Sequence, residues 1–327
     1  MAHEITIRED GYAEMAFVGG TPWHGLGQEL QADADMDAWR VAAGMDWTIE
    51  QAPVQYKVPT IHGAEPFGFC KYDGRFVQYR SDTGMPLSVV SERYKPVQPH
   101  EVLSFFDELV KEAGFRLHTA GTLFGGKRMW ALAETGRFGE ISKDDGVGGF
   151  LLLSTSADKS LATTARFTTV RVVCNNTLSL AARDKSDCVS FTHSRAFDHE
   201  LIKRKLGTAV ESFGAFMEMA QHLRKQRVTQ DAASAFVRRL VLSNEQLVDP
   251  DYNYQKNRAY AKIINLFNGE ARGAELVGDS KWGLLNAVTE YYDHHMPART
   301  PDARLNSAWF GNGEANKEAM VNMLLAA

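Results

Sequence analysis

The segment Thr-Thr-Val-Arg-Val-Val-Cys-Asn-Asn-Thr-Leu, residues 168–178, combines groups that can contact an anion. It begins as a β-branched run typical of a buried strand and then breaks at Asn175 and Asn176. Because asparagine caps helices, we expect a helix over residues 178–182 that begins beside these amides. Arg171 lies within the strand. A strand that ends in capping amides beside an arginine predicts an anion-contacting corner, and an ordinary strand-to-helix turn is the alternative.

Lysine and arginine residues gather around this segment and follow it along the chain. Phosphate contacts need such side chains on one surface, and single-strand binders add aromatic side chains on which bases stack. Tyr79, Phe167 and Phe191 could supply the stacking, although a strand position favours a core role for Phe167. The predicted nucleic-acid-binding residues are Lys159, Arg166, Arg171, Asn175, Asn176, Arg183, Lys185, Lys203, Arg204 and Lys205.

The charge of the chain is unevenly distributed. A net charge of −5 counts against a protein that simply coats DNA. Residues 150–240, however, hold 14 Lys/Arg against eight Asp/Glu, whereas residues 1–60 hold three against ten. We therefore expect an anionic partner at the middle segment, and we expect Arg40 and Lys57 in the acidic first segment to contribute little. Alternatively, these lysines and arginines only lie on solvent-exposed helix surfaces and contribute to solubility.

Two arrangements could carry catalysis or bind a metal, and neither is favoured. Cys174 with His193 as its base would form a Cys–His pair, but Cys174 ends an apolar strand, where an inert buried thiol is usual. His294 and His295 are adjacent, so on a helix they point about 100° apart and cannot form the i,i+4 pair of a helical zinc site. We expect no catalytic residue, no metal site and no cofactor.

Composition predicts a globular cytoplasmic protein. Hydrophobic residues make up 44% of the chain and charged residues 24%, which are ordinary globular values. The three cysteines are widely spaced, which excludes a disulfide scaffold and fits a reducing compartment. We find no apolar run of about 18 residues and no signal-peptide pattern, and so expect no contact with a membrane.

Four blocks of sequence resemble one known family. They are residues 21–27 (TPWHGLG), 168–178, 282–291 (WGLLNAVTEY) and 308–313 (AWFGNG), in that order. These blocks are similar to those of the phage/plasmid-like DUF932 family. The resemblance implies a protein that phages or plasmids carry and that acts in the cytoplasm of a bacterial host cell. It also implies a distant relation to Rad52-like single-strand annealing proteins.

Residues 1–197 are expected to form a hairpin-rich, largely antiparallel sheet with one packed helix. Asp73-Gly74 suits a two-residue turn and predicts a hairpin between residues 67–72 and 75–80. The packed helix is the long one expected at 99–113. The other expected elements are a short helix at 37–44, strands at 47–50 and 54–58, and strand pairs at 116–122 with 127–133 and at 149–155 with 165–173.

Residues 198–327 are expected to be helical and packed on the sheet as one unit. Apolar residues recur at steps of three and four from Ile202 to Leu223, which predicts an amphipathic helix of about six turns. Further helices are expected at 230–241, 254–268, 281–293 and 313–326. Strands followed by helices indicate an α+β fold.

Together these features favour single-stranded nucleic-acid binding, extending to strand annealing, in phage or plasmid DNA metabolism and recombination. A basic surface would hold backbone phosphates while base edges stay free to pair, which needs no catalytic residue. A long site is built most simply from repeated subunits, so we expect a homo-oligomer. Two alternatives stay open: an enzyme acting on a nucleotide or nucleic acid through Asn175, Asn176 and His193, and a non-catalytic interaction protein of a mobile element.

Overall fold

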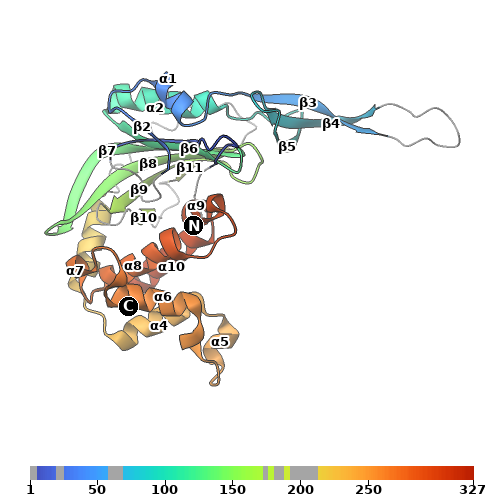
Figure 1. The fold of residues 1–327 in the computed structure, drawn as a ribbon. Helices are drawn as coiled ribbons and strands as arrows, with labels where there is room; N and C mark the ends of the chain where they lie inside the picture. The colour runs from blue at the N-terminus through green and yellow to red at the C-terminus, as the bar shows by residue number, and fades with distance from the viewer. Residues whose placement is uncertain (1–5, 20–25, 58–68, 172–175, 180–187, 192–212) are drawn as a thin grey trace, which may run out of the picture.

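The computed structural model describes residues 6–19, 26–57, 69–171, 176–179, 188–191 and 213–327. Strands dominate the first half of the chain and helices the second, so the predicted α+β class is confirmed. Two helices, a large sheet and a group of helices lie in successive layers, and a smaller sheet extends sideways from them (Figure 1).

The large sheet is built mainly from antiparallel hairpins. Its order is β10-β9-β8-β7-β6-β1-β2, and β11 pairs with the part of β9 that β10 leaves free. β1 runs parallel to β2, and the other pairs of this sheet in the described residues are antiparallel. The described strands are β1 (Met15–Val18), β2 (Gln28–Leu30), β6 (Arg116–Leu123), β7 (Arg128–Ser142), β8 (Asp145–Ser156), β9 (Thr163–Arg171), β10 (Asn176–Ser179) and β11 (Cys188–Phe191).

The segment after β9 differs from its prediction. Residues 176–179 form strand β10, not the start of a helix, and Asn176 lies opposite Arg171 in the antiparallel pair. The backbone of Asn176 therefore continues the sheet and does not cap a helix at residue 178. A five-residue helix is unstable by itself, whereas the edge of β9 offers backbone partners to an extended segment.

A second sheet is formed by β3 (Ile49–Lys57), β4 (Phe69–Arg80) and β5 (Pro86–Ser91). The predicted hairpin turn at Asp73-Gly74 is wrong, because both residues lie inside β4. Between the pairs Pro53↔Phe76 and Gln55↔Lys71, β3 advances two residues while β4 advances five. The Asp-Gly pair thus forms a bulge that bends the strand without reversing it.

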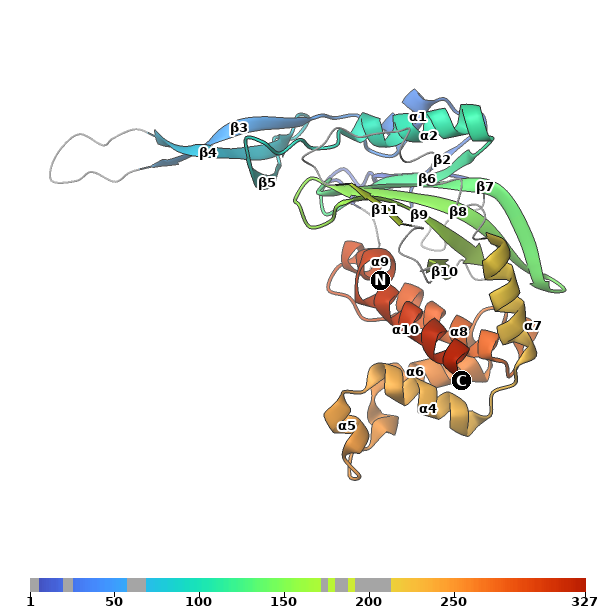
Figure 2. The same cartoon turned by 180° about the vertical axis from the view of Figure 1, so that it is seen from behind.

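Helices α1 (Met36–Ala42) and α2 (Pro99–Ala113) cover one face of the large sheet (Figures 1 and 2), and both were predicted. Trp39 of α1 and Phe105 of α2 share a core with Leu151 and Phe167 of the sheet. Burial of each such side chain contributes about 1.5–3 kcal/mol. Phe167 is only 2% exposed, so it is a core residue and does not stack bases.

The second half of the chain is helical, as predicted. Of the predicted amphipathic helix, the structure describes residues 213–225, and the earlier part lies outside the described residues. None of the described helices has the length and apolar character that a membrane-spanning segment needs. The other elements of this part are α4 (Gln230–Val241), α5 (Asn244–Val248), η2 (Tyr254–Lys256), α6 (Arg258–Asn265), η3 (Leu266–Glu270), α7 (Ala274–Val277), α8 (Lys281–Glu290), η4 (Tyr291–His295), α9 (Pro301–Phe310) and α10 (Asn312–Ala326).

The helical part lies against the other face of the large sheet (Figure 2). Trp130 of β7 meets Trp309 of α9 edge to face, with ring centroids 5.0 Å apart. At the far end of the β7–β8 hairpin, Ile141 and Val147 enter the core formed by the helices. The large sheet is therefore packed on both faces.

His118 makes this packed sheet sensitive to acid. It is the extra residue at the register shift of β6 and contacts Phe150 edge to face. Burial lowers the pKa of His118, and the charge of Glu134 offsets this only in part. As the pH falls, the ring therefore binds a proton in the unfolded chain, at about pH 6.5, before it does so in the folded protein.

We expect the melting temperature of the wild type to fall relative to that of His118→Gln as the pH decreases from 8 to 5. The difference in melting temperature between the two proteins should be nearly constant above pH 7, where the ring is mostly neutral in the folded and the unfolded chain. Melting curves at one-unit intervals measure it, and a gap that does not change with pH contradicts the assignment.

Candidate nucleic-acid interface

The structure describes the side chains of two predicted binding residues, and they lie in different surroundings. Lys159 is exposed in the turn between β8 and β9, and its Nζ donates to the carbonyl oxygen of Val89 in β5 at 2.7 Å. Arg166 on β9 faces the helical part, with 18% of its side chain exposed and its Nη1 3.5 Å from Oε1 of Glu314.

The other predicted residues are placed less fully or not at all. Arg171 and Asn176 are located by their backbones as Cα partners across β9 and β10. The remaining predicted binding residues lie outside the described part of the chain: Asn175, Arg183, Lys185, Lys203, Arg204 and Lys205.

The outer ends of β3 and β4 form a two-stranded ribbon with exposed aromatic and basic side chains. Phe69 is 71% exposed and lies opposite Lys57. Lys71, two residues along β4, lies opposite Gln55, and alternation along a strand places it on the same face as Phe69 and Lys57. Tyr56 is 50% exposed on the other face. We call residues 55–57 and 69–75 the basic ribbon.

The charge of the basic ribbon is positive. Lys57, Lys71 and Arg75 are exposed, and Asp73 is the carboxylate among its residues. Arg75 lies opposite Ser91 of β5, and Lys159 contacts the same strand through Val89. The cations thus extend from the ribbon to the edge of the large sheet.

The β7–β8 hairpin provides a comparison within the same molecule. Phe138 is 61% exposed there, and the hairpin also carries the exposed cations Arg137 and Lys143. Two exposed carboxylates, Glu140 and Asp144, balance those cations. An exposed Phe with an excess of positive charge therefore distinguishes the basic ribbon from this hairpin.

The basic ribbon projects from the body of the protein, and polar contacts hold its base (Figures 1 and 2). A two-stranded hairpin is marginally stable alone, so the base must fix it. The N–H of Ile49 donates to Gln98 Oε1 at 2.8 Å, next to the start of α2. The hydroxyl of Ser88 donates to the carbonyl oxygen of Ala157 at 2.7 Å, and that of Tyr94 to Ser156 at 3.1 Å.

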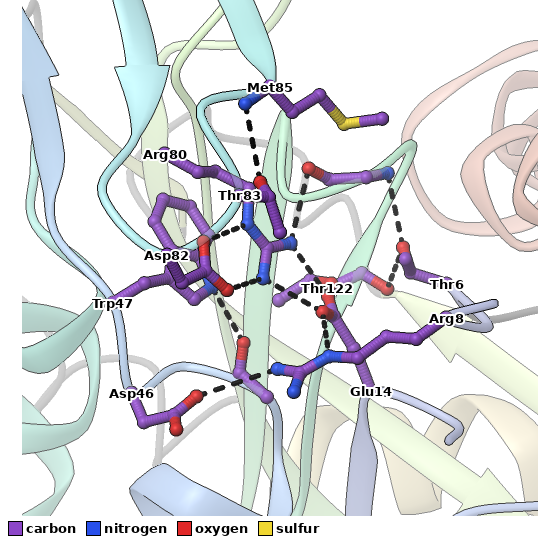
Figure 3. Close-up of polar contacts among 12 residues, drawn as sticks. Thr6, Arg8, Glu14, Asp46, Trp47, Arg80, Asp82, Thr83, Met85 and Thr122 are labelled. Atoms are coloured by element: carbon purple, nitrogen blue, oxygen red, sulfur yellow. Dashed lines mark hydrogen bonds and ion pairs between the residues drawn. The ribbon is translucent and has the colours of Figure 1, made fainter. Parts of the chain in front are cut away.

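A buried ion-pair network fixes the inner end of β4 (Figure 3). Arg80 is 2% exposed, and its guanidinium donates to Glu14 at 2.9 and 3.1 Å and to Asp82 at 2.8 and 2.9 Å. Burial opposes the charged forms, but hydrogen bonds and opposite charges outweigh it, raising the pKa of Arg80 and lowering that of Asp82. The network joins β4 to Glu14, the residue before β1.

The surroundings of Arg80 complete this link between the two sheets. Its guanidinium lies 4.3 Å from the centroid of the Trp47 ring. Glu14 also accepts a hydrogen bond from Arg8 Nε at 2.7 Å and one from the hydroxyl of Thr122 in β6. Gly126 has φ +91°, and a Cβ there would lie 2.6 Å from the Trp47 ring, so only glycine fits.

The sequence pattern missed the side chains of the basic ribbon. Averaging the charge over residues 1–60 hid Lys57, and the predicted Asp-Gly turn placed Phe69 and Lys71 in a separate hairpin. The available signal was the combination of two aromatic residues and a lysine in Phe69-Cys70-Lys71-Tyr72, all four of which lie in β4. Tyr79, a predicted stacking residue, is half-buried nearer the base.

The chain matches a known protein family. The family model described as "Domain of unknown function (DUF932)" matches residues 86–309, which is more than half of the chain. No curated protein and no solved structure matches the chain.

Proposed function

The chain belongs to the DUF932 family, and we propose that it binds single-stranded nucleic acid on the basic ribbon. The observation that carries this proposal is the position of Phe69. It is 71% exposed on a ribbon that projects from the body, with Lys57 opposite and Lys71 two residues away on the same face.

The chemistry of this face suits a single strand better than a duplex. An aromatic ring can stack on a base that is not already stacked within a double helix, and neighbouring lysines neutralise the backbone phosphates. Neither contact reads the base edge, so binding is expected to be tolerant of sequence. Tyr56 and Tyr72, 50% and 56% exposed, provide further aromatic surface.

Strand annealing in phage or plasmid DNA metabolism is the proposed role of such binding. Contacts to phosphates and base faces leave base edges free to pair with a second strand. Homo-oligomerisation would align several ribbons along one strand and raise the overall affinity. The predicted residues outside the described part, Lys203, Arg204 and Lys205 among them, are proposed to extend the phosphate contacts.

The salt dependence of binding tests this function. We expect full-length protein to bind a fluorescent single-stranded oligonucleotide at 50 mM salt and to lose affinity steeply by 200 mM. The logarithm of the binding constant should fall linearly with that of the salt concentration, by about 0.7 for each phosphate neutralised. Fluorescence anisotropy measures both quantities.

A duplex of the same sequence is the control ligand and should bind at least tenfold more weakly at each salt concentration. Absence of binding at 50 mM salt overturns the proposal and leaves the interaction-protein alternative. Equal affinity for the duplex contradicts the stacking role of the ribbon, because bases within a duplex are not free to stack on Phe69.

A further inference from the structure

Two arginines and one aromatic ring meet between the large sheet and the helical part, away from the basic ribbon. Arg128 on β7 and Arg166 on β9 each place the guanidinium carbon 5.4 Å from the ring centroid of Phe310. The two guanidinium carbons are therefore at most about 11 Å apart, twice that distance. Phe310 belongs to the Ala-Trp-Phe-Gly-Asn-Gly motif at residues 308–313. The nucleic-acid binding proposed for the basic ribbon does not involve this motif.

The sequence of that motif sets the position of the ring. Phe310 is the last residue of α9, and α10 begins at Asn312. A Cβ at Gly313 would lie 2.8 Å from the carbonyl oxygen of Ser307, so the close contact of α9 and α10 requires glycine. The tight turn holds Phe310 against the sheet, while Trp309 beside it packs on Trp130.

The two arginines lack enough acceptors for their N–H groups. Nε of Arg128 and both Nε and Nη2 of Arg166 are buried with no hydrogen-bond partner in the described structure. Arg128 is 7% exposed, and its Nη2 donates to the hydroxyl of Ser160 at 2.7 Å. An unmet donor of a buried charged group costs several kcal/mol in an apolar site.

The nearby carboxylates neutralise the cluster only in part. Glu314 lies 3.5 Å from Arg166 and 3.6 Å from Lys317, whose ammonium also contacts Asp293. Arg128 forms no ion pair with any residue that the structure describes. Burial lowers the pKa of Arg128, and the charge of Asp158, which the Ser160 hydroxyl contacts, offsets this in part. An anion would complete the cluster.

We propose that Arg128 and Arg166 bind a phosphate group between the large sheet and α9–α10. The charge and the unmet donors together indicate the ligand class. Two guanidiniums with three unmet nitrogen donors suit an anion that carries more than one negative charge, and phosphate provides a charge of about −1.5 to −2 with at least three strong acceptor oxygens. Phe310 contacts both arginines, so the group recognised is the phosphate and not a base.

Titration of the full-length protein with inorganic phosphate tests the site. We expect isothermal titration calorimetry to show saturable binding of one phosphate per chain, and the melting temperature to rise with phosphate but not with acetate at equal ionic strength. Arg128→Lys and Arg166→Lys keep the charge but lose the paired N–H groups, and each should weaken phosphate binding more than tenfold.

Arg116→Lys is the matched control, because Arg116 is 73% exposed beside Glu134 on the neighbouring strand. It should bind phosphate as the wild type does. Wild-type protein without saturable phosphate binding, or an equal loss in Arg116→Lys, overturns the proposal and leaves the unmet N–H groups to water. The titration of wild-type protein tests the proposal even if a variant does not fold.

The source of the phosphate group is distinguished by further ligands. A nucleoside 5′-monophosphate that competes with inorganic phosphate indicates a nucleotide, and an oligonucleotide that competes only when 5′-phosphorylated indicates a strand end. Inorganic phosphate alone is the third outcome. Phe69→Ala should leave phosphate binding unchanged. The experiments therefore test the phosphate site and nucleic-acid binding by the basic ribbon independently.

Discussion

Replacing Arg80 with Met lowers the free energy of unfolding by about 3 kcal/mol. The variant leaves Glu14, which is 1% exposed, with Arg8 as its remaining charged partner, and Asp82 without its guanidinium. It also removes the contact of the guanidinium with Trp47. Breaking a buried pair on one side is costly, because the remaining charge stays buried without compensation.

Chemical denaturation of the variant measures this loss, and Arg40→Met is its matched control. Arg40 pairs with Asp37 across an exposed helix surface, where such a pair contributes at most about 0.5 kcal/mol. Glu14→Gln in the Arg80→Met background should recover part of the loss, since a neutral amide costs less to bury than a carboxylate. Equal effects of Arg80→Met and Arg40→Met contradict a stabilising role for the network.

The sequence correctly predicted the elements whose apolar residues are buried in the core, because burial requires a regular spacing of those residues. Helix 99–113 has Pro99 at its start, Gly114 at its end and an apolar face, and the structure gives α2 the same bounds. The predicted strand pairs correspond to β6–β7 and β8–β9, which helices cover on both faces of the sheet. Strands that are buried on both faces carry nearly continuous apolar runs, and these runs identified them.

The incorrect predictions concern segments for which local pattern allowed two solutions. Asp73-Gly74 can form a hairpin turn or a bulge, and pairing with a distant strand, β3, selected the bulge. Asn176 can cap a helix or extend a strand, and the edge of β9 selected the strand. In both cases the structure depends on pairing with a strand elsewhere in the chain, and the sequence of the segment alone does not show that pairing.

The candidate site was harder to predict than the fold because it depends on exposure. A sequence does not show that Phe69 is 71% exposed while Phe167 is 2% exposed, since both lie in segments that it predicts as strands. Counting charges by segment likewise treated Lys57 as part of an acidic region and Arg166 as a surface cation. The structure places Arg166 against Glu314 and Phe310 instead.

Phe69→Ala weakens single-stranded nucleic-acid binding by about fivefold to 150-fold, if one base stacks on its ring at about 1–3 kcal/mol. The slope of affinity against salt should hardly change, because stacking displaces no counterions. Lys57→Gln with Lys71→Gln should weaken binding and also lower the salt slope by about 1.4, or about 0.7 for each phosphate that a lysine no longer neutralises. Fluorescence anisotropy over a range of salt concentrations separates the two effects.

Phe138→Ala is the matched control for Phe69→Ala, because Phe138 is 61% exposed on a hairpin with balanced charges. It should bind as the wild type does. A combined Lys203→Gln, Arg204→Gln and Lys205→Gln variant tests the predicted residues outside the described part. If that variant loses binding while the ribbon variants keep it, the protein binds nucleic acid through residues 150–240 and the ribbon has another partner. If Phe69→Ala and Phe138→Ala weaken binding equally, exposed aromatic surface alone explains the effect, because the excess positive charge is what distinguishes the two sites.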